Sequence, residues 1–133
     1  MIKDKISEIY DALMSDEELS KITIKSFERP ETLPTDQTSI VIIPLGPPIQ
    51  SDQGSNTSFS KTFLYQINVE SINRIECKKL QGLVEKVMES QGFYQIAGGL
   101  DEWIPEIKRY ADARTYKGKS KLYDDCLLYT SDA

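Results

Sequence analysis

Hydrophobic residues recur at helical spacing in two parts of the chain, with charged residues between them, and each part predicts an amphipathic helix. The first helix is expected to end near Ser15, and its apolar positions are Ile2, Ile6, Ile9, Leu13 and Met14. The second follows Asn73, which forms a capping-box pattern with Glu76 three residues later, and it is expected to stop at Gly92. Its apolar positions are Leu80, Leu83, Val84, Val87 and Met88. Gly82 within it costs about 1 kcal/mol relative to alanine, which a close approach to the sheet or to the first helix would justify.

Three segments before the second helix have the character of strands. Residues 22–27 are rich in β-branched residues, and residues 38–45 form a continuous apolar run, which predicts a strand covered on both faces. Residues 59–70 alternate and predict a half-buried strand antiparallel to residues 38–45, with one apolar face made of Phe63, Tyr65, Ile67 and Val69. The intervening residues 49–58 are mostly small and polar, a composition typical of a mobile loop.

After Gly92 the pattern predicts short strands joined by turns. Residues 93–97 form one strand, Gly98 and Gly99 a turn, and residues 107–116 a longer strand that ends at Lys117 and Gly118, after which residues 119–123 are a candidate hairpin partner. The order α-β-β-β-α-β-β predicts an α+β fold, in which two helices pack on one face of a mainly antiparallel sheet.

Length and composition fit one domain, residues 1–125, in a chain of 133 residues that is 39% hydrophobic and 28% charged. The longest apolar run is too short to cross a bilayer, and the first residues lack the pattern of a signal peptide, so we expect a protein made in the cytoplasm without a membrane partner. Residues 126–133, CLLYTSDA, read as the in-frame translation of a transposase-based library adapter, and we expect them to be a non-native tail; the alternative is a short C-terminal strand with a natural cysteine.

The residue types for common catalytic sites are scarce. The chain has no histidine, and of its two cysteines, Cys77 and Cys126, the second lies in the suspected tail. The usual general base, the usual zinc ligand and the Ser-His or Cys-His pairs are therefore missing, and we expect neither an enzyme nor a metal or other cofactor. Asp101 and Glu102 suit acid–base or Mg²⁺ chemistry, but adjacent carboxylates in an exposed turn are more simply solvated.

Charge is distributed unevenly around a net value of −5, which argues against a nucleic-acid binder because phosphate neutralisation needs a basic face. Acidic residues weight the first third, and basic residues gather late in the sequence: Lys108, Arg109, Arg114, Lys117, Lys119 and Lys121. The cluster is either a set of solvated positions or one half of an electrostatically matched contact, between copies or with a neighbouring protein.

Three blocks of sequence together resemble the small tail-terminator or tail-completion proteins of long-tailed phages. The first is residues 30–45 with the Gly46-Pro47-Pro48 loop, and the second is the aromatic strand 63–69. The third and most specific runs from Gly98-Gly99-Leu100-Asp101-Glu102 through Arg109-Tyr110-Ala111-Asp112-Ala113-Arg114 to Tyr116-Lys117-Gly118. The resemblance covers most of residues 1–125.

The resemblance implies a structural virion protein without catalysis. Copies would form a ring, a hexamer, on the last ring of the tail tube in the neck of the virion, with the major tail tube protein and the head–tail connector protein as partners. The runner-up from the residues alone is a small monomeric α+β module that binds a ligand or nucleic acid, in which Phe63 and Tyr65 would stack bases.

Candidate interface residues are of two kinds. A loop segment would order on contact with the tube or connector, and it contains Gln53, Gly54, Ser55, Asn56 and Thr57. Trp103 is either a packed core aromatic or an interface anchor. Arg109, Asp112, Arg114 and Lys117 form either intramolecular or intersubunit contacts, and alternation along the strand puts Asp112 and Arg114, but not Arg109, on one face.

Overall fold

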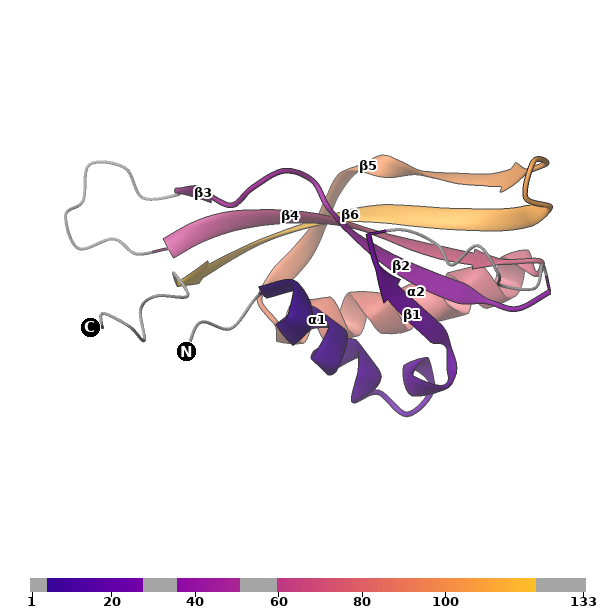
Figure 1. Cartoon of the computed structure of the whole chain (residues 1–133), viewed down its shortest axis with the longest axis horizontal. Coiled ribbons are helices and arrows are strands. Elements are labelled where there is room, and N and C mark those ends of the chain that lie inside the picture. Colours follow the sequence, from indigo (N-terminus) through magenta and orange to yellow (C-terminus); the bar gives the residue numbers. More distant parts are fainter. Residues whose placement is uncertain (1–4, 28–35, 51–59, 122–133) are drawn as a thin grey trace.

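Two helices cover one face of a twisted sheet in the computed structural model, which describes residues 5–27, 36–50 and 60–121 (Figure 1). The helices are α1 (Lys5–Met14) and α2 (Arg74–Ser90), with the short 3₁₀ helix η1 (Leu19–Lys21) after α1. The strands are β1 (Thr23–Ser26), β2 (Ser39–Pro44), β3 (Ile49–Gln50), β4 (Ser60–Ser71), β5 (Phe93–Ile104) and β6 (Arg109–Lys121). The predicted α+β architecture and its element order are confirmed, with β3 as an addition.

The strands lie side by side in the order β1-β2-β4-β6-β5, and β3 pairs with the first part of β4. All pairs are antiparallel except β1 with β2. The predicted pairing of the apolar run with the alternating strand is confirmed, since Ile40 lies opposite Val69 and Ile42 opposite Ile67. Ile49 and Gln50, expected in a loop, instead pair with Thr62 and Lys61.

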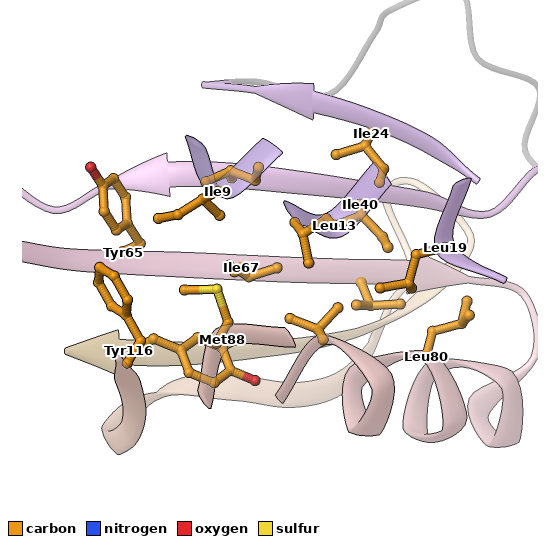
Figure 2. Packing of buried hydrophobic residues seen from close by; sticks show 14 of the residues in the cluster. Ile9, Leu13, Leu19, Ile24, Ile40, Tyr65, Ile67, Leu80, Met88 and Tyr116 are labelled. Carbon is orange, nitrogen blue, oxygen red and sulfur yellow. The ribbon is translucent and has the colours of Figure 1, made fainter. Parts of the chain in front are cut away.

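The hydrophobic core lies between the helices and the sheet (Figure 2). Ile9 and Leu13 of α1 point toward Ile40 and Ile67, as their helical spacing predicts. The alternation in β4 is also confirmed, because its predicted apolar face is buried: Phe63, Tyr65, Ile67 and Val69. In β2 the side chains from Ser39 to Ile42 are buried on both faces, as the continuous apolar run predicts.

Helix α2 begins and ends as predicted, although only half of its capping box forms. The Asn73 side chain accepts hydrogen bonds from the backbone N–H groups of Ile75 and Glu76. The Glu76 carboxylate does not return to Asn73 but accepts from Thr38 Oγ1 at 2.8 Å and Ser71 Oγ at 2.7 Å. Glu76 thus connects α2 to β4 and to the segment before β2.

Gly82 does not have the packing role expected for it. A β-carbon built at Gly82 would meet no atom within 4 Å, so neither the sheet nor α1 approaches it closely. The glycine therefore weakens α2 without a compensating contact.

The two glycines after residue 97 form a bulge and not a turn. Strand β5 continues through Gly98 and Gly99, while its register with β6 jumps from Ile96–Thr115 to Gly99–Arg114. The chain reverses instead at residues 105–108, and β6 continues through Gly118 to Lys121, so residues 119–121 do not form a separate strand. Residues 122 and 123 of that prediction lie outside the described residues. Glycine suits both a turn and a bulge, so composition alone did not separate them.

No helix within the described ranges is both long and apolar enough to cross a membrane.

Candidate functional site

A charged hollow of about 550 Å³ lies between the side of α2 and the bulge in β5. Lys78 contributes from α2, Asp112 and Arg114 contribute from β6, and the bulge contributes Gly98 and Gly99. Asp101 stands opposite Asp112 in the β5–β6 register, so that both carboxylates face α2. The alternation of β6 and the bulge in β5 thus bring together charges that lie far apart in the sequence.

Asp112 is the centre of this cluster and is only 2% exposed. Arg114 Nε donates to its Oδ1 at 3.0 Å, and Lys78 Nζ donates to its Oδ2 at 2.9 Å. Arg114 also lies 3.5 Å from Glu85 of α2, and its hydrogen bond with Asp112 raises the pKa of its guanidinium against the opposing effect of burial. A buried carboxylate held by two cations is a structural arrangement, because removal of either partner leaves charge in the protein interior.

Asp101 closes the outer side of the cluster. Its carboxylate accepts hydrogen bonds from Lys78 Nζ and from the Tyr110 hydroxyl, and these two bonds lower its pKa. The Tyr110 ring in turn makes cation–π contacts with Lys78 Nζ, 5.7 Å from its centroid, and with the Arg74 guanidinium, 6.0 Å from its centroid. The ionisable groups in the hollow are therefore paired with one another.

Gln81 bridges the helix and the two central strands below the hollow, and it is fully buried. Its Nε2 donates to the Asp112 carbonyl at 2.7 Å and to the Ile67 carbonyl at 3.1 Å, while its Oε1 accepts from the Tyr116 hydroxyl at 2.9 Å. Every polar atom of the side chain thus has a partner. Cys77, one helical turn before Gln81, donates to the carbonyls of Val69 and Tyr110.

Burial raises the pKa of the Cys77 thiol from 9.0 to about 11, with a further contribution from Asp112, and burial also raises the pKa of Tyr116. Both groups have a higher pKa in the folded than in the unfolded state. The contribution of Cys77 to stability is therefore complete below pH 9 and is lost as the pH rises toward 11, whereas that of Tyr116 begins to fall only near its ordinary pKa of 10. We expect the unfolding free energy to fall through this range, with Cys77 contributing up to about 1.4 kcal/mol per pH unit.

Urea denaturation of the wild type and of Cys77→Ala at pH 8, 9 and 10 would measure this effect. The alanine variant should be less stable at pH 8 but should lose stability less steeply above pH 9. Equal slopes in the two proteins would contradict a raised thiol pKa.

The candidate interface residues separate into buried and exposed sets. Arg109 is 1% exposed, and its Nη2 donates to the backbone carbonyls of Gln37 and Glu70. The contacts of Arg109 and of the Asp112–Arg114 pair are therefore intramolecular. As the alternation along β6 predicts, Arg109 has other partners than that pair. Trp103 is 49% exposed on β5, and Lys117 is half-buried on β6. The loop candidates Gln53, Gly54, Ser55, Asn56 and Thr57 lie outside the described residues, as does Cys126.

The structure also places the residues considered for base stacking and for acid–base or metal chemistry. Phe63 and Tyr65 are 3% and 5% exposed and stack within the core, so neither ring is available to a base. Asp101 and Glu102 lie on an exposed strand and not in a turn, and their side chains point to opposite faces of β5. No group of three metal-ligating side chains occurs among the residues that the structure describes.

Basic and acidic residues gather at opposite ends of the folded chain, which their order in the sequence does not predict. One end is the arm, which we define as residues 49–50, 60–64 and 117–121 of β3, β4 and β6; it contains four lysines and no carboxylate. The other end is the tip, residues 100–108 of β5 and the following turn, which contains three carboxylates and one lysine. Figure 1 shows the arm and the tip at opposite ends of the longest axis. The late basic cluster is thus divided, and only part of it lies on the arm.

Sequence reasoning missed the contributions of α2 to this site. Gln81 had a readable signal, because it lies on the same helical stripe as Cys77, Val84 and Met88, where a polar residue needs internal partners. Lys78 had none, since its partners belong to strands whose register is not visible in the sequence.

Comparisons with known proteins show a shared fold. No protein-family model matches the chain, and no curated protein matches it. Among solved structures, a chain of the "Virion of native gene transfer agent (GTA) particle" is similar, with a TM-score of 0.58 and 13% sequence identity. The similarity covers 85% of this chain and 91% of that chain. At this level of identity, the likeness shows the fold alone.

Proposed function

We propose that this chain is a structural protein of a phage-like virion, and more specifically that it terminates the tail tube and takes part in joining tail to head. The observation that carries the proposal is the fold, which nearly the full length of a virion chain shares. The sequence blocks described above, among them the Gly98–Glu102 segment, resemble tail terminators and point to the same role.

The chemistry of the described residues supports a role in assembly. In the charged hollow between α2 and β5, Lys78, Asp101, Asp112 and Arg114 neutralise one another and connect the helix to the sheet. Exposed apolar side chains occur at both ends of the molecule, with Ile49 on the arm and Leu100 and Trp103 on the tip, and further ones lie outside both, such as Phe27 and Ile75. A subunit that exposes a different apolar surface at each end suits a heterologous contact, which closes into a ring when the rotation between subunits allows it.

In this proposal the ring, a hexamer, sits in the tail-neck region. It contacts the major tail tube protein on one side and the head–tail connector protein on the other, and it forms in the host cytoplasm without a cofactor. Residues 53–57 are proposed to contact one of these partners.

Disruption of the gene in the phage or prophage that carries it would test the proposal. We expect unjoined heads and tails with tubes of uncontrolled length in electron micrographs, and restoration of normal virions when the wild-type chain is supplied in trans. Normal virions without the chain would overturn the role, and so would absence of the chain from purified wild-type virions.

A further inference from the structure

The two ends of the molecule carry opposite charge. A hollow of about 450 Å³ on the arm is lined by Thr62, Tyr94, Lys117 and Lys119, together with the backbone of Gly92 and Gly118. Tyr94, whose side chain is 55% exposed, stands beside Lys117 in the register of β5 and β6. The hollow therefore combines an open aromatic face with basic side chains.

The tip presents the opposite character. Trp103 is half-exposed near the end of β5; Glu102 precedes it on the same strand, with its side chain on the other face, and Glu106 follows in the turn. Both carboxylates are exposed. A tip that carries an exposed tryptophan and two exposed carboxylates matches a hollow that offers an aromatic ring and lysines, because aromatic anchors supply contact area and unlike charges fix orientation.

We propose that the tip of one copy inserts into the arm hollow of a second copy, with Trp103 against Tyr94 and with the exposed carboxylates of the tip near the lysines of the arm. This inference rests on the proposed ring and names the surfaces that would build it. The contact is heterologous, since tip and arm are different surfaces at opposite ends of the subunit, so every copy both gives and receives one contact.

Site-directed cross-linking tests the arrangement. In a Cys126→Ser background, the only other thiol is the buried Cys77, so Glu102→Cys and Lys119→Cys place single accessible thiols on tip and arm. A bismaleimide should join the two variants when they are mixed and should join neither variant to itself. A chain that carries both substitutions should give a ladder that ends at the ring size.

The cross-linking is carried out on the purified protein and in cells that are assembling virions. Lys86→Cys, on the exposed face of α2, is the matched control for Lys119→Cys and should give no product with Glu102→Cys. Absence of the tip–arm product in both settings would overturn the proposal, as would cross-linking of either single variant to itself.

Charge reversal gives a second measurement. The pair Glu102→Lys and Glu106→Lys, and separately the pair Lys117→Glu and Lys119→Glu, should each weaken self-association at least about tenfold, as expected when like charges face each other across an interface. All four changes in one chain should restore it. If cross-linking succeeds but gene disruption leaves virions normal, the virion role fails alone; if disruption blocks joining but tip and arm do not cross-link, this inference fails alone.

Discussion

Replacement of Gly99 with alanine is expected to destabilise the protein by about 3 kcal/mol, because the residue has both a forbidden backbone conformation and no space for a side chain. Its φ is +105°, and a β-carbon there would lie 2.8 Å from the carbonyl carbon of Ala113 and still nearer to its oxygen. The obstacle is the backbone of the partner strand β6, which cannot rotate away. Urea denaturation monitored by circular dichroism would measure the loss.

Gly82→Ala is the matched control, since it adds the same methyl group at a position with open space and helical geometry. That variant should gain about 0.5–1 kcal/mol. If Gly99→Ala were as stable as the wild type, the bulge in β5 would not have the geometry described here.

Replacement of Gln81 with methionine should cost about 3 kcal/mol, although the two side chains have similar size. The change removes the acceptor of the Tyr116 hydroxyl and the donor of the Ile67 and Asp112 carbonyls, and all of these groups lie in the interior. Denaturation of Gln81→Met, Tyr116→Phe and the double variant would measure the pair. We expect the double variant to be at least about 1 kcal/mol more stable than the sum of the single changes predicts.

Gln95→Met provides the control on the surface of β5, where the glutamine side chain is exposed. It should change stability by no more than about 0.5 kcal/mol. Strict additivity of the Gln81 and Tyr116 substitutions would show that their hydrogen bond does not contribute to the fold.

The elements with one-sided burial could be predicted from the sequence. Helix α2 and strand β4 each have an apolar face of the right period. The helix boundaries follow from Asn73 and Gly92, and the end of the alternation at Glu70 lies one residue before the observed end of β4. The shared face of Asp112 and Arg114 followed from the same alternation, and the structure places their side chains 3.0 Å apart.

Features that depend on register could not be predicted in this way. Gly98 and Gly99 satisfy the backbone demands of a turn as well as those of a bulge, and only the pairing of Gly99 with Arg114 decides between them. The charged hollow depends on the same register, because it sets Asp101 opposite Asp112 and within reach of Lys78. The order of charges along the chain also does not predict an acidic tip and a basic arm. The reason is that β6 runs from the tip to the arm, so residues close together in the late sequence lie at opposite ends of the molecule.

The position of β6 has a consequence for how the protein is made. It lies between β4 and β5 although it is the last strand in the described part of the chain. While the ribosome is still translating residues 109–121, one edge of β4 therefore lacks its neighbour and β5 has nothing to pair with. The sheet can close only after β6 has been synthesised, so the nascent chain is open to aggregation or to chaperones until then.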